Sequence, residues 1–420
     1  IDHVKAMSAL CDQLLPKLPK LQKLAIRSST FEAIAAMQRP LALPALQSLT
    51  WTWQAAPMIA APNCQEFLAF GLSSPDAVRT VAQLPALRTL QLRLGESDAA
   101  LTAEQERELF VDSDGRPRWP QLEQFDTASQ VALSTAAFCE HAKAWTNLRV
   151  LRIALRAPVA PAQLQAMLLQ MLRLEEVSVV VDNRNPASSQ SSDPSPRACA
   201  DKPAATLRWL RRLELAVADD VLLTAFELPE LRELKLRGNL VRVQHLERCL
   251  ALAPALQTLW IGSNDLVLSA PCSPPLKHIA SVSVTSNMNR DNFERLLKSC
   301  PTVRNLNINS TDVSGNRVDK STLAALGSCG VQQLRNLHAP NIDACADSIA
   351  ALVTSQPSAR TMMLGRAELS SECTIVHVVT RLLELLRGQR RDPPCTVSFR
   401  NNLHRIAIAV GLNGPGVVPV

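Results

Sequence analysis

The titratable and nucleophilic residues of this 420-residue sequence form no recognisable catalytic arrangement. The sequence contains no H-E-x-x-H zinc motif, no G-x-S-x-G nucleophile elbow, no Walker loop and no dinucleotide-binding G-x-G-x-x-G. The seven His are isolated from one another, which favours solvated or capping roles. Asp112-x-Asp114-Gly115 begins like a calcium loop, but Arg116 stands where a third ligand belongs and the Gly comes too early. We therefore expect no enzyme, no catalytic residue, no metal and no cofactor.

The side chains that could instead bind a partner alternate with aliphatic residues in short stretches. Successive side chains of a β-strand point to opposite faces, so residues between the leucines lie on the face opposite to the core. We expect this face to be the concave side of a curved sheet. It gives the candidate partner-binding residues Arg93, Arg152, Arg156, Lys235, Arg237, Trp260, Asn305 and Asn307.

The basic candidates suit an acidic partner, because complementary charges steer and orient association. They are Arg152, Arg156, Lys235 and Arg237. The alternative is that these four side chains form an ordinary solvated charged face.

Trp260 and the asparagines suit other contacts. An exposed Trp on a binding face is the residue type that anchors interfaces, unless a long neighbouring side chain covers it. Asn305, Asn307 and Asn309 form a row that either meets a partner or bonds along the sheet as a ladder of side-chain hydrogen bonds.

A sequence repeat must position these residues. In the stretch Leu228–Asn239, LPELRELKLRGN, Leu231, Leu234 and Leu236 each have a counterpart 25 residues later, in the stretch that ends at Asn264. Such a period should be settled before any other interpretation. Further stretches of this kind begin at residues 21, 46, 87, 122, 148, 174, 210, 279, 303, 334 and 359, and residues 396–399 read as a last strand.

Between these strands the hydrophobic period becomes helical. Phe293, Leu296, Leu297 and Cys300 lie at i, i+3, i+4 and i+7, and Pro301 ends the helix. A unit of one strand and one helix cannot bury its own leucines, so neighbouring units must stack.

We predict a single solenoid over residues 1–420 with two insertions. Spacing between units varies from 21 residues (Leu210 to Leu231) to 41 (Leu46 to Leu87). An insertion at 95–119 contains Thr102-x-x-Gln105, a capping box opening a polar helix. A second, at 182–206, is rich in Ser, Pro and Asp and is predicted to be disordered. Residues 411–420 are predicted to form a frayed tail.

Composition limits the class of protein further. The net charge of +6 is spread along the chain without a concentrated basic stripe, so nucleic acid is an unfavoured partner. The 11 Cys are dispersed without a C-x-x-C pair, which argues against disulfides and favours the cytoplasm or nucleus. No apolar run approaches the roughly 18–20 residues of a membrane span, so no membrane association is expected.

The pattern P-x-L-x-x-L-x-L-x-x-N resembles the leucine-rich repeat, and this resemblance covers most of the chain. It implies an α/β solenoid with parallel strands on the concave face and helices on the convex face. Residues 292–308, NFERLLKSCPTVRNLNI, are similar to the cysteine-containing subtype, in the order Phe, Leu-Leu, Cys-Pro, Val, Leu, Ile. That subtype is common in F-box proteins, which recruit substrates to cullin-type ubiquitin ligases.

Three functional hypotheses follow. The leading one is a non-enzymatic scaffold that holds a protein partner on its concave face, with the F-box-type substrate receptor as a narrower version. The second is a structural subunit of a large assembly, whose basic rows would touch RNA or a protein neighbour. The third is a regulator of small GTPases, which the chain resembles in architecture alone.

Overall fold

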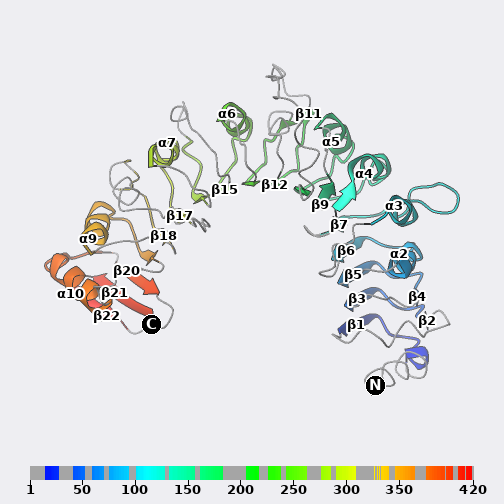
Figure 1. Ribbon diagram of the computed structural model, residues 1–420, viewed down its shortest axis with the longest axis horizontal. Helices are drawn as coiled ribbons and strands as arrows, with labels where there is room; N and C mark the ends of the chain where they lie inside the picture. Colours follow the sequence, from blue (N-terminus) through cyan, green and yellow to red (C-terminus); the bar gives the residue numbers. More distant parts are fainter. Residues whose placement is uncertain are drawn as a thin grey trace. The chain divides into compact units, whose positions relative to one another are not determined.

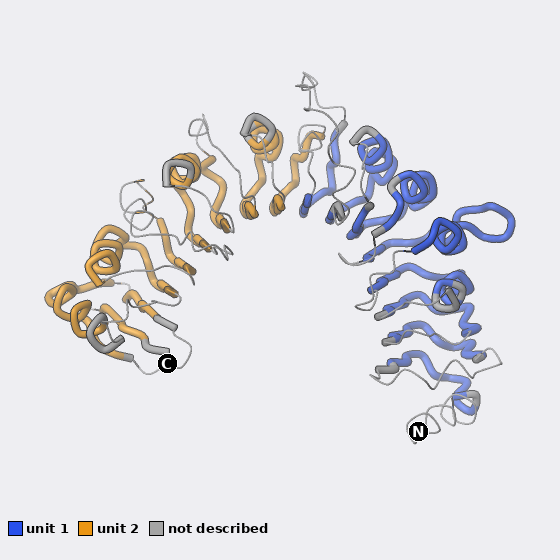
Figure 2. The backbone as a smooth tube through the Cα atoms, in the orientation of Figure 1, with its two compact units in different colours: residues 1–217 blue, residues 218–420 orange. Residues whose placement is uncertain are grey.

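The computed structural model divides the chain into two compact units, residues 1–217 and 218–420 (Figure 2). It describes residues 15–27, 41–52, 59–70, 75–93, 101–127, 132–156, 161–182, 205–216, 226–237, 243–262, 276–284, 290–308, 326, 329, 331, 333–339, 346–364, 375–392, 394–400, 405–411 and 413–418.

The first unit contains a parallel sheet whose strands pair in chain order. β1 pairs with β3, β3 with β5, β5 with β6 and β6 with β7. β9 pairs with both β7 and β8 and, on its other edge, with β10, which pairs with β12. These strands are β1 Lys23–Arg27, β3 Ser48–Thr52, β5 Glu66–Phe70, β6 Thr89–Arg93, β7 Gln124–Asp126, β8 Ala132–Ser134, β9 Val150–Arg156, β10 Glu176–Asp182 and β12 Arg212–Ala216.

The second unit repeats the arrangement. β14 to β20 pair in parallel, one after another, and β21 and β22 continue antiparallel. Leu234 lies opposite Leu259 and Leu236 opposite Ile261, which confirms that the two best-matched repeats are adjacent parallel strands. The strands are β14 Glu233–Arg237, β15 Thr258–Gly262, β16 Ser281–Val284, β17 Asn305–Ile308, β18 Asn336–Ala339, β19 Thr361–Leu364, β20 Cys395–Arg400, β21 Arg405–Gly411 and β22 Gly414–Val418.

Helices occupy the other side of each unit (Figure 1). They are α2 Pro75–Ala82, α3 Ala103–Phe110, α4 Thr135–Ala142, α5 Pro161–Leu168, α6 Val243–Leu252, α7 Arg290–Ser299, α9 Ala346–Ser355 and α10 Ile375–Leu385, with a short 3-10 helix η2 at Leu15–Lys17. Further short strands are β2 Leu41–Ala42, β4 Ile59–Ala60, β11 Ala205–Thr206 and β13 Phe226–Glu227. Among the described helices, none is long and apolar enough to cross a membrane. The fold is an α/β leucine-rich-repeat solenoid, as the repeat predicts.

The core lies between the strands and the helices. Strands such as β14 alternate between buried and more exposed residues, because every second side chain points inward. Trp51, Cys249 and Cys300 are fully buried, as their places in the pattern predict. In the loosely matched repeat at residue 334, Ala339 fills the third inward position and is also fully buried.

Backbone hydrogen bonds fix the register between coils. Two consecutive N–H groups, such as those of Gln257 and Thr258, donate to one carbonyl of the preceding coil, here Arg232, each at 2.9 Å. Turn side chains add to this, since Asn63 Nδ2 donates to the Pro44 carbonyl at 2.8 Å. These bonds hold side chains of equivalent positions in rows across the sheet.

The predicted insertion at 95–119 contributes a helix of the stack. The capping box is present, with Gln105 N donating to Thr102 Oγ1 at 3.2 Å and Thr102 N to Gln105 Oε1 at 2.8 Å. The helix, however, is not polar on all faces: Phe110 is buried against Phe125 and Trp145. Tertiary packing of one apolar face therefore makes this segment a regular part of the coil.

A strand that the repeat pattern does not reveal lies between residues 46 and 87. β5 pairs in parallel with both β3 and β6, so the 41-residue gap contains two coils instead of one long insertion. Cys64, Phe67 and Ala69 occupy the inward positions, and all three are buried. Their side chains replace leucine, which is why the pattern misses them.

The predicted frayed tail at 411–420 is wrong for the part that the structure describes. Residues 414–418 form β22, which pairs antiparallel with β21, and Ile408 of β21 is fully buried. Residues 1–14, Trp53 and residues 183–204, the bulk of the predicted disordered insertion, lie outside the described residues. The single solenoid over residues 1–420 stays a prediction.

Candidate functional site

Two rows of side chains run across each sheet, one on the face that points away from the helices and one where the strands begin. The centre row is the third residue of each strand, which lies between two buried residues. The edge row is the residue immediately before each strand, whose carbonyl accepts the paired backbone hydrogen bonds. The centre row contains four of the eight candidate binding residues, Arg152, Lys235, Trp260 and Asn307, and the edge row contains none of them.

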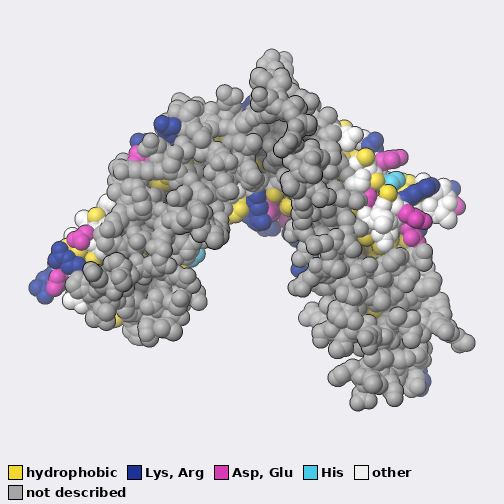
Figure 3. All heavy atoms as spheres, in the orientation of Figure 1, with side chains coloured by type: hydrophobic (Ala, Val, Ile, Leu, Met, Phe, Trp, Pro, Cys, Tyr) yellow, Lys and Arg dark blue, Asp and Glu magenta, His cyan; other side chains and the backbone are white. Residues whose placement is uncertain are grey.

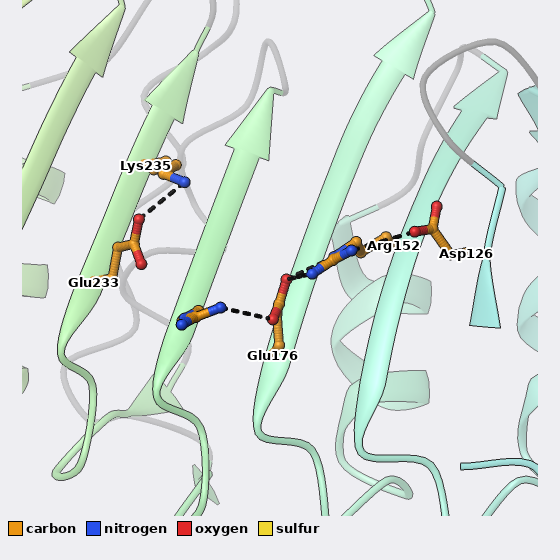
Figure 4. A network of polar contacts seen from close by, with 6 residues as sticks. Asp126, Arg152, Glu176, Glu233 and Lys235 are labelled. Carbon is orange, nitrogen blue, oxygen red and sulfur yellow. Dashed lines mark hydrogen bonds and ion pairs between the residues drawn. The ribbon is translucent and has the colours of Figure 1, made fainter. Parts of the chain in front are cut away.

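In the first unit the charges of the sheet face neutralise one another. Arg152 lies between two carboxylates, with N–O distances of 3.3 Å to Asp126 and 2.6 Å to Glu176 (Figure 4). Arg212 approaches the second oxygen of Glu176 at 3.4 Å. The hydrogen bond to Glu176 is the largest cause that raises the pKa of Arg152. Because two arginines meet two carboxylates, this cluster has little net charge to offer an acidic partner.

The other first-unit candidates lie apart from this cluster. Arg93 ends β6 and its side chain is exposed. Arg156 ends β9, where its backbone lies opposite Ser134 and Asp182, and its side chain is outside the described residues. The four basic candidates are therefore divided between the units: Arg152 and Arg156 belong to the first, Lys235 and Arg237 to the second.

In the second unit an aromatic–cation pair joins β14 and β15, the first two strands of the sheet. The Arg237 guanidinium carbon is 4.9 Å from the centroid of the Trp260 ring, a distance at which the ring attracts the cation. Trp260 is partly exposed, so the neighbouring long side chain covers it in part. Lys235, next to Trp260 in the register, bonds to Glu233 of its own strand at 2.9 Å. A surface of mixed aromatic and cationic character results.

The asparagine candidates bond to the next coil. Asn336 Nδ2 donates to Asn305 Oδ1 at 2.7 Å, and Asn307 Oδ1 lies 3.0 Å from His338 Nδ1. Asn305 and Asn307 thus take part in side-chain hydrogen bonds along the sheet, as one of the two interpretations predicts. Their partners are Asn336 and His338 of β18. Asn309 lies outside the described residues.

The edge row differs between the units, and the sequence analysis did not single it out. In the first unit it alternates in sign, with Arg88 3.1 Å from Glu123 and Arg149 paired with Glu175. In the second unit it ends with three exposed arginines, Arg304, Arg335 and Arg360. The signal was present in the sequence, since each follows the first inward residue of its repeat.

Nothing in the described residues suggests catalysis. The described ranges contain no group of three or more His, Cys, Asp or Glu residues that could hold a metal ion. Asp112, considered for calcium, accepts from the backbone N–H groups of Asp114 and Arg116 at 2.9 and 2.8 Å and so closes its own turn. Buried thiols such as Cys249, whose pKa burial raises to about 12, are poor nucleophiles.

On the face seen in Figure 3, positive and negative side chains are interspersed around α3. Exposed residues of both signs, such as Glu104, Arg107, Asp114 and Arg116, belong to this segment. Mixed charges of this kind form an ordinary solvated surface, so the helix side there offers no single-sign patch.

Comparison with known proteins yields structural likeness only. No protein-family model matches the chain, and no curated protein matches it. An internalin from Listeria monocytogenes aligns with a TM-score of 0.43 at 11% identity, over 91% of this chain and 92% of its own. TLR13, in a complex with ssRNA13, aligns with a TM-score of 0.44 at 14% identity, over 92% of this chain and 50% of its own. At this level of similarity neither structure identifies a partner for this chain.

Proposed function

We propose that this protein is a non-enzymatic scaffold that binds a protein partner on the strand side of its sheets. The observation that carries this proposal is the pair of Arg237 and Trp260 on β14 and β15, the first two strands of the second unit's sheet. Trp and Arg are the residue types most enriched among interface anchors. Here they lie on strands whose backbone is fixed by parallel pairing, so little conformational entropy remains to be lost on binding.

The helix side supports this choice by contrast. Its outward residues around α3 are of mixed charge, whereas the sheet face holds rows of equivalent side chains in register. Rigid elements present a binding constellation more accurately than loops do. A partner that is matched to the repeat spacing would therefore find its contacts already in place on the strand side.

Capture of interacting proteins with single variants tests the proposal. Trp260→Ala should lose at least about 1 kcal/mol of binding, the usual threshold for an important interface residue, and the partner should disappear from the captured set. Trp209→Ala is the matched control, because Trp209 is 58% exposed but precedes a strand of the first unit. If both variants retain the partner at full level, the surface around Trp260 is not the binding surface.

A narrower version of this function is the substrate-recognition part of an F-box-type ubiquitin ligase. It is favoured by the cysteine-containing repeat at residues 292–308, in which Cys300 is fully buried at the end of α7. Co-purification with cullin-type ligase subunits under reducing conditions is the result this version predicts. A stable ribonucleoprotein or a small GTPase in the same experiment would support one of the other classes instead.

A further inference from the structure

The edge row of the second unit ends in a line of three like charges. Arg304, Arg335 and Arg360 immediately precede β17, β18 and β19, which are consecutive paired strands. Their backbones are joined directly, since Arg335 N donates to the Arg304 carbonyl and Arg360 N to the Arg335 carbonyl, each at 2.7 Å. Adjacent strands lie about 4.7–4.9 Å apart, so three guanidinium groups start from neighbouring points of one line.

This line of arginines makes no ion pair in the described structure. Within the described ranges, neither an ion pair nor a side-chain hydrogen bond is found for Arg304, Arg335 or Arg360, and all three are exposed. In the described parts of β16 to β20 and the turns that lead into them, the single carboxylate is Asp392. Like charges directly opposite each other across strands are destabilising.

In the first unit, arginines at the same position of the coil are paired with carboxylates of the neighbouring coils. There the edge row places Glu123 next to Arg88 and Glu175 next to Arg149, and both pairs are in contact. The fold therefore accepts a carboxylate at this position of the coil. The second unit carries arginine in three coils in succession, and none of the described residues balances these charges through an ion pair.

We propose that Arg304, Arg335 and Arg360 bind a carboxylate-rich segment of a partner protein. This deepens the proposed function and rests on it in one respect, namely that the partner is a protein. Arginine suits the role because its planar guanidinium forms bidentate hydrogen bonds to a carboxylate. Asn305 and Asn336, which lie beside the row and bond to each other at 2.7 Å, offer amide groups to the same ligand.

The spacing of the row favours a helical acidic segment. A helix with one carboxylate per turn repeats about every 5.4 Å, close to the distance between strands. An extended peptide repeats its same-face side chains about every 6.6 Å and would fall out of register after two coils. Single-stranded RNA is the other polyanion to consider, but it is held by aromatic stacking as well as charge. In β17, β18 and β19 the one aromatic ring is that of His338.

Binding of a fluorescent helical peptide with one Glu per turn tests the proposal on the full chain. Arg335→Gln should weaken binding at least about fivefold, and substitution of all three arginines by Gln should abolish it. Arg88→Gln is the matched control, because Arg88 holds the same position in a first-unit coil whose charge is already balanced, and it should change the affinity less than about twofold. Binding should weaken as salt is raised, since exposed charges are screened.

Three results would overturn the inference. They are equal effects of Arg335→Gln and Arg88→Gln, equal affinity for a peptide of the same composition in which prolines break the helix, and tighter binding of a single-stranded RNA than of the peptide. Circular dichroism of each variant excludes loss of fold as the cause. Trp260→Ala should leave peptide affinity within about twofold, because Trp260 lies on β15, two strands from β17. Loss of partner capture by Trp260→Ala tests the proposed function, and loss of peptide binding by the arginine variants tests this inference. Failure of one can therefore be told from failure of the other.

Discussion

Arg391 is a buried arginine that completes the end of a helix. Its guanidinium donates to the Val353 carbonyl at 3.2 Å and to the Gln356 carbonyl at 2.5 Å, at the C-terminus of α9. The last carbonyls of a helix have no partner within it and carry partial negative charge, which a buried cation satisfies. This residue therefore links the turn before β20 to the helix of the preceding coil.

We expect Arg391→Met to lower the free energy of unfolding by about 2–3 kcal/mol, because hydrogen bonds from a charged donor to buried carbonyls are lost. Urea unfolding at neutral pH measures this. Arg390→Met is the control, since Arg390 is the adjacent residue and is exposed, and it should change stability by less than about 0.5 kcal/mol. Equal stability of the two variants would show that the buried guanidinium does not hold α9.

Cys249 gives a pH-dependent prediction at the same scale. Burial raises the pKa of its thiol from 9.0 to about 12, so the folded state keeps a proton that the unfolded chain releases. The corresponding stability is present below pH 9 and is lost as the pH rises from 9 towards 12. Between pH 8 and pH 10 the wild type should lose about 1.4 kcal/mol more than Cys249→Ala, because one pKa unit corresponds to about 1.4 kcal/mol. Parallel loss in both proteins, measured by urea unfolding, would contradict a buried neutral thiol.

At the scale of elements, the sequence predicts most coils because inward leucines recur, and it fails where other side chains fill the same space. β5 is the clearest failure. Phe67 and Ala69 complete the core as a large and a small residue, and packing depends on total volume more than on residue identity. The helix at 103–110 shows the opposite case, since its capping box is local and could be predicted without any tertiary contact.

The assignment of β5 to the sheet predicts the effect of single substitutions within it. Phe67 is 1% exposed, so Phe67→Ala should cost about 3–5 kcal/mol of stability. Leu68 is adjacent and points to the other face, where it is partly exposed, and Leu68→Ala should cost less than about 1 kcal/mol. Thermal or urea unfolding of the two variants compares them directly. A larger loss for Leu68→Ala would place this segment in the opposite register.

At the scale of the whole molecule, the sequence predicts which residues face outward but not which charges remain uncompensated. Arg152 lies outward by parity, between the buried Leu151 and Ile153, and Arg335 is an exposed residue immediately before β18. Arg152 is balanced by Asp126 and Glu176, whose contacts depend on the register between coils, whereas Arg335 has arginines on both neighbouring coils. Only the paired strands reveal this difference. This difference supports the proposal that an acidic partner binds the edge row of the second unit instead of Arg152.

Site-specific photo-crosslinking tests most directly whether the strand side carries the function. A photoreactive amino acid at Asn305, the exposed first residue of β17, would be compared with one at Lys298, an exposed residue of α7 in the same coil. Both variants should fold alike and meet the same partners. We expect the captured partner to crosslink from position 305 and not from position 298. Crosslinks from position 298 alone would mean that the partner binds the helix side, and that the rows across the sheet serve another purpose.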